Sequence, residues 1–185
     1  MKVRSQLIPK ASGKVFEMGC GGGINQQFYD ASMVGSFSGM DPSLKGIEFA
    51  RAAAAQKGWD ADLRQGFGEA IPFGDASFDC VVCTYTLCSV EDPGQVLKEM
   101  RRILRTGGLL LFAEHGQAPD EGVRKWQTRI EPVWKRLAGG CHLTRPISSA
   151  VSAGGFQVEP IGACYIPKTP RWAGWMEWGA AVKTG

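Results

Sequence analysis

Residues 15–23 read VFEMGCGGG, a short apolar run followed by four glycines in five positions. This order predicts a buried strand that turns through a tight loop, because glycine tolerates positive φ and lets the backbone approach a ligand closely. In α/β sheets, ligands bind at the carboxyl ends of the strands. The stretch therefore predicts an α/β fold with a candidate binding loop. The glycines alone are also consistent with a plain strand-to-helix turn that binds no ligand.

The rest of the chain alternates apolar, strand-like runs with segments of helical period, which is typical of a parallel sheet with crossover helices. The predicted strands cover residues 14–18, 36–40, 61–66, 78–84, 108–114, 156–166 and 176–183. The predicted helices cover 25–31, 43–57, 93–104 and 120–137, with a short one after Pro146. Gly107 and Gly108 are expected to end the third of these helices, and Gly139 and Gly140 the fourth.

We therefore expect a Rossmann-like, doubly wound sheet of about seven strands with helices on both faces. It is mostly parallel, and its last two strands form an antiparallel pair joined by the Trp-rich loop 167–175. We expect residues 1–185 to form one domain. Residues 1–115 would be the half that carries the candidate binding loop, and 116–185 would supply further helices and the C-terminal strand pair.

Composition narrows the class of protein. The 185 residues carry 21 basic and 18 acidic side chains, a net charge of +3 without a long basic cluster, so no nucleic-acid partner is expected. No apolar run approaches the roughly 20 residues of a membrane span, and the first dozen residues lack the apolar core of a signal peptide. We expect a soluble, cytoplasmic protein with a small-molecule partner, and the oligomeric state stays open.

The six cysteines are expected to be small buried hydrophobes rather than a disulfide framework. Cys80 and Cys83 form a C-x-x-C, but residues i and i+3 of a strand point to opposite faces. No second Cys/His pair occurs at zinc spacing. The sequence therefore predicts no metal site.

The spacing of the glycines distinguishes between two kinds of cofactor. A dinucleotide fingerprint, G-x-G-x-x-G, would need its third glycine at Ile24. The chain instead has Glu17-x-Gly19-x-Gly21-x-Gly23. Asp41 follows the second predicted strand, where a carboxylate can accept hydrogen bonds from both ribose hydroxyls of a nucleoside. NAD enzymes bind their ribose in the same way, so Asp41 supports a nucleoside without distinguishing between the two cofactors. The alternative is that Asp41 caps a helix.

These motifs resemble those of class I S-adenosylmethionine-dependent methyltransferases with a type 11 methyltransferase domain. GFGEAIPF at 66–73 with D-x-S-F-D at 75–79 is similar to a signature of that superfamily, with Phe67 in place of its usual Asp. CTYTLCSVEDP at 83–93 and L-x-E-x-x-R-x-L-x-x-G-G at 97–108 are similar to further motifs of the small-molecule members. The resemblance extends over about residues 14–115.

The resemblance implies S-adenosylmethionine as cofactor and S-adenosylhomocysteine as product. Glu17 would face the cofactor's amino group, Asp41 the ribose, and Phe67 would stack on the adenine or turn inward. The implied cofactor-binding residues are Glu17, Gly19, Cys20, Gly21, Gly23, Asp41, Pro42, Phe67, Gly68, Glu69, Thr84 and Tyr85.

A closer resemblance is to the methyltransferase-like seven group of small thiol methyltransferases. It rests on VVCTYTLCSV at 81–90, FAEHG at 112–116, P-x-W at 132–134, GCHLTR at 140–145 and GAAVK at 179–183. The implied activity is S-methylation of small alkyl thiols. Members carry an N-terminal hydrophobic anchor, and with about 13 residues before the first predicted strand we expect no anchor here.

Methyl transfer from a sulfonium is an in-line displacement, so the enzyme's main task is to align acceptor, methyl group and sulfur. A thiol acceptor reacts as the thiolate, which a nearby imidazole or cation would favour. We predict that His115 contacts the acceptor or acts as its base, with Cys88, His142 and Arg145 also in the acceptor pocket. The alternative is that both histidines pack against the loops or cap a helix, and that Cys88 and Cys141 are small buried hydrophobic residues.

The favoured function is therefore a methyltransferase acting on a small, apolar acceptor, with a thiol as the preferred class. N-, O- or C-methylation of a phospholipid amine, a phenol or a quinone precursor is the alternative within that class of enzyme. An NAD-dependent oxidoreductase and a non-catalytic cofactor-binding protein are the alternatives from other classes.

Overall fold

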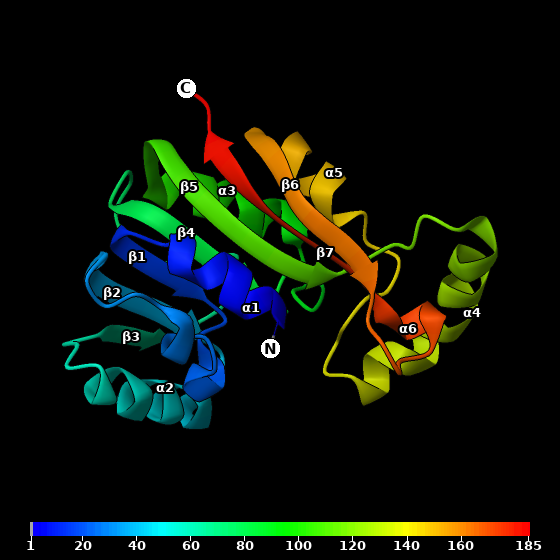
Figure 1. The fold of residues 1–185 in the computed structure, drawn as a ribbon, viewed down its shortest axis with the longest axis horizontal. Coiled ribbons are helices and arrows are strands. Elements are labelled where there is room, and N and C mark those ends of the chain that lie inside the picture. The colour runs from blue at the N-terminus through cyan, green and yellow to red at the C-terminus, as the bar shows by residue number, and fades with distance from the viewer. Residues whose placement is uncertain (1) are drawn as a thin grey trace.

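The computed structural model describes residues 2–185, and within them the strands form one seven-stranded sheet in the order β3-β2-β1-β4-β5-β7-β6 (Figure 1). The strands are β1 (Gly13–Met18), β2 (Val34–Asp41), β3 (Asp62–Gln65), β4 (Phe78–Thr84), β5 (Leu104–His115), β6 (Phe156–Tyr165) and β7 (Trp175–Lys183). β1 to β5 are parallel, whereas β7 runs antiparallel between β5 and β6. The predicted doubly wound fold is confirmed, and its strand order reverses between β1 and β4.

Helices cover both faces of this sheet (Figure 1). They are α1 (Lys2–Leu7), α2 (Leu44–Gln56), α3 (Pro93–Ile103), α4 (Glu121–Leu137), α5 (Ile147–Ala153) and α6 (Arg171–Gly174). One buried cluster joins the sheet to α1 and α2, and a second joins the other face to α3 and α5. Cys80 belongs to the first cluster and Cys83 to the second, so the two thiols face opposite sides of the sheet, as expected from strand geometry.

Three local predictions were wrong. The chain forms α1, which the sequence did not predict, because six residues before a proline carry too little helical period to detect. The predicted helix 25–31 is only a 3-10 turn, Gln26–Phe28. α3 ends at Ile103, and β5 begins at once at Leu104, so Gly107 and Gly108 lie inside the strand. They occupy a bulge, since the pairing of β4 with β5 jumps from Leu104 to Leu109.

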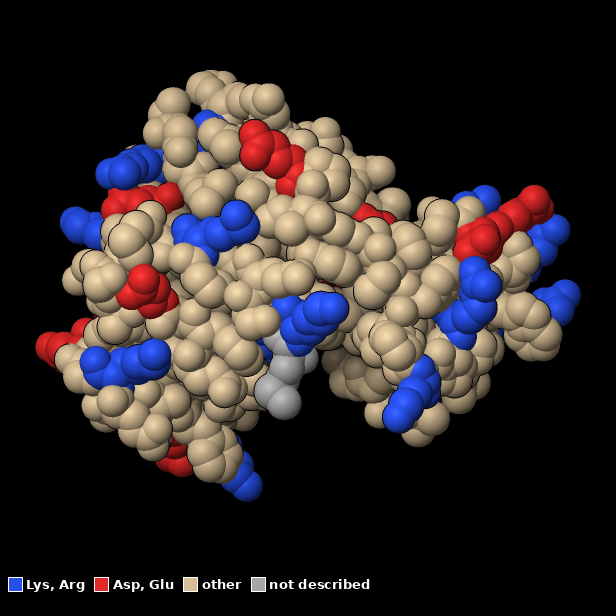
Figure 2. All heavy atoms as spheres, viewed as in Figure 1, with Lys and Arg blue, Asp and Glu red and all other residues tan. Residues whose placement is uncertain are grey.

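α4 and α6 form a lobe that projects beyond the sheet, and Lys and Arg side chains gather on its surface (Figures 1 and 2). Trp134 of α4 packs edge-on against Trp172 of α6, with ring centroids 5.3 Å apart. The apolar face of α4 is only partly covered, because Trp126, Val133 and Leu137 are exposed to 57%, 59% and 80%. The expected stop at Gly139 and Gly140 is confirmed, and both glycines have positive φ.

None of the helices formed by residues 2–185 combines the length and the apolar character needed to cross a membrane.

Candidate active site

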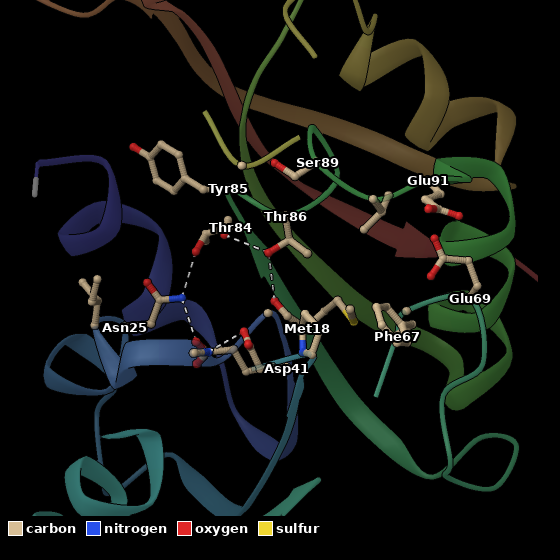
Figure 3. A pocket seen from close by; sticks show the side chains of 18 of the residues that line it. Met18, Asn25, Asp41, Phe67, Glu69, Thr84, Tyr85, Thr86, Ser89 and Glu91 are labelled. Carbon is tan, nitrogen blue, oxygen red and sulfur yellow. Dashed lines mark hydrogen bonds between the residues drawn. The ribbon is translucent and has the colours of Figure 1, made fainter. Parts of the chain in front are cut away.

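A cavity of about 870 Å³ opens at the carboxyl ends of β1, β2 and β4, where the strand order reverses (Figure 3). This is the position at which doubly wound sheets bind their ligands. The cavity is lined by Arg4, Glu17, Met18, Gly19, Gly21, Ile24, Asn25, Asp41, Pro42, Phe67, Gly68, Glu69, Thr84, Tyr85, Thr86, Ser89, Val90, Glu91 and Gly139.

The glycine loop after β1 forms one wall of the cavity, and Gly19 and Gly21, which line it, have no room for side chains. A Cβ on Gly19 would lie 2.1 Å from Thr86 Oγ1, and one on Gly21 would lie 2.5 Å from Asp41 Oδ2. Gly23, with φ +62°, lies against α2, where an added Cβ would meet the Cβ of Ala53 at 2.8 Å. A Cβ on Gly22 would meet only the Ile24 side chain, at an ordinary contact distance of 3.6 Å, so its φ of +80° is what favours glycine there.

A buried hydrogen-bond network surrounds the carboxyl group of Glu17. Asn25 Nδ2 donates to Glu17 Oε1 over 3.0 Å and to Thr84 Oγ1 over 2.9 Å. Tyr29 donates its hydroxyl to Glu17 Oε2 over 2.7 Å, and Arg4 Nε donates to Asn25 Oδ1, also over 2.7 Å. Burial raises the pKa of Glu17 to about 7, against the opposite effect of its Tyr29 and Asn25 hydrogen bonds. A cationic ligand group would stabilise the ionised form.

Asp41 lies at the end of β2 and contributes to both the loop and the cavity. Its Oδ2 accepts a hydrogen bond from Gly21 N and its Oδ1 one from Ser43 N, each over 2.9 Å. The helix cap itself is Ser43, whose Oγ accepts from Gly46 N over 3.1 Å at the start of α2. The carboxylate thus fixes the turn between the two walls while it also lines the cavity.

The opposite wall comes from the segment between β3 and β4. Phe67 lines the cavity with 70% of its surface exposed, so its ring is free to stack on a planar ligand. Glu99 Oε2 of α3 accepts a hydrogen bond from Ile71 N over 2.8 Å, and Arg102 Nη2 donates to Ile71 O over the same distance. α3 therefore holds this segment in place.

The turn after β4 forms the third wall, and Glu114 of β5 fixes it. The fully buried Glu114 carboxyl accepts hydrogen bonds from Thr86 N at 2.9 Å, Leu87 N at 3.0 Å and Cys88 N at 3.2 Å. Burial raises its pKa, and these backbone donors oppose the shift. Sequence reasoning gave Glu114 no role, although an acid at the end of the most apolar strand was a signal that could have shown one.

Tyr85 lies at the centre of this wall in a strained conformation. Its φ is +55°, an uncommon value for a bulky residue. The Arg4 guanidinium stacks over its ring at 4.5 Å, and the His115 ring lies edge-on to it at 5.2 Å. Tyr85 thus joins α1 to the end of β5, and backbone strain of this kind is concentrated at functional sites.

Ten of the twelve residues predicted to bind the cofactor line the cavity, and Cys20 and Gly23 do not. The Cys20 side chain is fully buried in the core beneath Gly39, and Gly23 packs on α2. Sequence reasoning missed Arg4 and Asn25, which reach the cavity through α1 and through the side-chain network around Glu17.

The four predicted acceptor residues lie behind the cavity wall rather than on it. His142 Nδ1 pairs with Glu131 Oε1 at 3.0 Å. Arg145 donates to the carbonyls of Leu87 at 2.5 Å and Val90 at 2.7 Å, so it holds the turn after β4 from the rear.

The remaining two, Cys88 and His115, meet Cys141 in a compact cluster whose sulfur and ring-nitrogen atoms all lie within 4.8 Å of one another. A hydrogen bond with Cys88, followed by the hydrogen bond and charge of His115, lowers the pKa of Cys141. The same bond to Cys141, together with burial, raises the pKa of Cys88.

Comparison with known proteins agrees with the fold. A family model described as a methyltransferase domain matches residues 16–112. The chain belongs to this methyltransferase family.

Among curated proteins, the chain is 39% identical to thiol S-methyltransferase TMT1B of Homo sapiens over 148 residues, covering 73% of this chain and 57% of that protein. It is 31% identical to thiol S-methyltransferase TMT1A of Homo sapiens over 150 residues, covering 80% and 62%. The chain thus spans little more than half the length of these relatives.

Among solved structures, the YcgJ protein of Bacillus subtilis superposes with a TM-score of 0.79 at 17% identity, covering 100% of this chain and 97% of that one. At this identity the likeness shows the fold alone.

Proposed function

We propose that this chain binds S-adenosylmethionine in the cavity at the end of β1 and transfers its methyl group to a small thiol. The observation that carries the proposal is the pair of buried or half-buried carboxyls, Glu17 and Asp41, on either side of a loop that excludes side chains. An anion at Glu17 suits the cofactor's ammonium, and a carboxylate at Asp41 suits the two ribose hydroxyls.

The other predicted cofactor contacts fit the same ligand. Phe67 offers a ring face to the adenine, and the neighbouring Gly68 lines the same cavity, where it packs so closely on Met18 that an added Cβ would lie 2.7 Å from Met18 Cε. The cofactor supplies an activated methyl group on a sulfonium. The residues of the cavity align that group with the acceptor, and this positioning can lower the barrier by about 7–11 kcal/mol.

The acceptor side is proposed to lie beyond Tyr85, towards His115 and the residues after α4. His115 would contact the acceptor or take the thiol proton, because its ring touches Tyr85, which lines the cavity. A thiol is favoured because two relatives are named thiol S-methyltransferases. In this proposal residues 1–115 form the cofactor-binding half and residues 116–185 the acceptor side of one domain.

Calorimetry and turnover test the two parts of the proposal. S-adenosylmethionine and S-adenosylhomocysteine are expected to bind, and NAD is not; tight binding of NAD alone would contradict a methyltransferase. With cofactor saturating, product formation is measured against alkyl thiols, amines and phenols. Turnover confined to amines or phenols would contradict a thiol acceptor, and binding without turnover of any acceptor would contradict catalysis.

A further inference from the structure

Cys88, His115 and Cys141 come from three separate parts of the chain: the turn after β4, the last position of β5 and the segment after α4. Their candidate ligand atoms lie within 4.8 Å of one another, and Cys141 Sγ is 3.9 Å from His115 Nδ1. A tetrahedral zinc ion, with Zn–S bonds of about 2.3 Å and a Zn–N bond of about 2.0 Å, holds its ligand atoms roughly 3.5–3.8 Å apart. Small side-chain movements would bring the three atoms to these separations.

The backbone around the cluster is already fixed. His142 N donates a hydrogen bond to Cys88 O over 2.7 Å, which joins the segment after α4 to the turn after β4. Cys88 N is held in turn by Glu114 Oε2 at 3.2 Å, and the His115 ring rests on Tyr85. The two thiols are buried and the imidazole half-buried. The fold therefore holds the three side chains together without a ligand, which lowers the conformational cost of binding one.

The chemistry of this set fits a thiophilic cation. Two thiolates and a neutral imidazole balance the charge of Zn²⁺, so the metal and its three protein ligands would together add no net charge to this largely buried position. The sequence predicted no metal site because Cys88, His115 and Cys141 do not lie at the short spacing of local zinc motifs. The sheet and the loop after α4 bring the three side chains together.

We propose that Cys88, His115 and Cys141 form a zinc site with a fourth, open coordination position on the acceptor side of the cavity. Catalytic zinc sites have this composition of three protein ligands, including Cys₂His sets, and structural sites have four. Two residues that line the cavity are neighbours of the ligands in the sequence. Ser89 follows Cys88, and Gly139 lies two residues before Cys141. The site is therefore close to where the proposed acceptor would enter.

An open position beside the cavity has a chemical consequence that rests on the proposed function. A thiol that replaces a zinc-bound water forms a Zn–S bond as the Zn–O bond breaks, and its proton leaves with the solvent, because a coordinating thiol is deprotonated at neutral pH. His115 is then a metal ligand rather than the base. The resulting thiolate would be the nucleophile, and no oxidation or reduction takes place.

Metal content tests the site itself. The reduced, full chain is stripped with a chelator, dialysed against zinc, and measured by elemental analysis together with S-adenosylhomocysteine binding. About one zinc per chain is expected. Cys88→Ser and Cys141→Ser should bind zinc more than tenfold more weakly, whereas Cys164→Ser, which changes an exposed cysteine outside the cluster, should keep the full content.

Wild-type chain that binds S-adenosylhomocysteine but retains no zinc would overturn the site, and so would equal zinc content in all three variants. A disulfide between Cys88 and Cys141 in the chain as purified, before reduction, mapped by mass spectrometry of its peptides, would do the same. Cofactor binding reports on the proposed function independently, so the two can fail separately.

Cobalt substitution tests the open position. Co²⁺ in place of zinc should give the thiolate-to-metal absorption and the visible bands of a tetrahedral site, both absent from Cys141→Ser. Addition of 2-mercaptoethanol should intensify the charge-transfer band, because a further sulfur enters the coordination sphere. A cobalt spectrum that the thiol leaves unchanged would overturn the open position and the acceptor role.

Discussion

At the scale of single residues, Glu17 has the environment most closely tied to ligand binding. Its pKa of about 7 lies above the ordinary 4.5, so the cofactor-free folded protein binds a proton that the unfolded chain has released in this pH range. The contribution of Glu17 to the free energy of unfolding is therefore fully present below about pH 4.5 and declines as the pH rises through 7. A bound ammonium reverses the preference, because it favours the carboxylate.

We therefore predict that S-adenosylhomocysteine binds more tightly as the pH rises, by about tenfold between pH 6 and pH 8, since binding below the pKa must release one proton. Calorimetry over this range measures both the affinity and the proton release. Glu17→Gln should bind weakly at every pH, and Glu48→Gln, an exposed acid of α2, should behave as wild type. An affinity of wild type that does not change with pH would contradict the role of Glu17.

Glu114 fixes the cavity wall from within the core, and its removal should be costly. Glu114→Ala leaves three backbone N–H groups without their acceptor, and we expect the free energy of unfolding to fall by about 3 kcal/mol, at roughly 1 kcal/mol or more for each donor. Denaturant unfolding measures the loss. Glu114→Gln keeps Oε1, which accepts two of the three bonds, so it should cost less than half as much. Equal losses would show that the hydrogen bonds do not determine the cost.

At the scale of elements, α3 fixes the wall that carries Phe67. Arg102 bonds to Glu99 on its own helix, to Asp75, and to the carbonyls of Ile71 and Phe73. The motif L-x-E-x-x-R at 97–102 thus has a structural role: its acid and arginine tie α3 to the segment that begins at Phe67.

Arg102→Met should consequently loosen this segment. We expect the free energy of unfolding to fall by roughly 2 kcal/mol, because hydrogen bonds to a charged group contribute about 1.5–3 kcal/mol, and cofactor affinity to fall several-fold. Lys125→Met is the control: its ion pair with Glu121 is exposed at 72% on both sides, and such pairs contribute little. Unfolding and calorimetry of both variants test this, and unchanged cofactor affinity in Arg102→Met would contradict the link from α3 to the cavity.

The strands and long helices could be predicted because each has its own period, and the binding loop because its glycines alternate. Elements without a period were missed, as α1 was. The bulge at Gly107 was also missed, since a glycine pair after a helix is as consistent with a cap as with a bulge. The sequence placed Cys88 and His115 in one pocket through the family resemblance, but their meeting with Cys141 was not predicted, because the segment after α4 reaches them only when the sheet has formed.

At the scale of the whole molecule, the structure has a compact sheet and a lobe of α4 and α6 that packs on it less completely (Figures 1 and 2). The sequence predicted a helix over residues 120–137 on the acceptor side, and that helix, α4, has an apolar face. Amphipathicity shows that a face is apolar but not what it packs against, and here Leu137 is 80% exposed. The cavity, in contrast, collects side chains from α1, the β1 loop, the end of β2 and the turn after β4, so a ligand there joins most of the sheet's carboxyl edge.

A ligand that joins these segments should stabilise the entire fold. A ligand present at 100 times its dissociation constant adds about 2.7 kcal/mol to the free energy of unfolding when the unfolded chain does not bind it. For a chain of this length each kcal/mol raises Tm by about 2–4 °C, so saturating S-adenosylhomocysteine should raise Tm by roughly 5–11 °C. Thermal unfolding of wild type and of Asp41→Ala with S-adenosylhomocysteine, and of wild type with NAD, provides the test. Asp41→Ala should show a smaller shift, because it loses the proposed ribose contact, and NAD should give none. A shift with NAD that equals the one with S-adenosylhomocysteine would mean that the cavity recognises only the nucleoside the two share, and that Glu17 does not select a ligand bearing an ammonium.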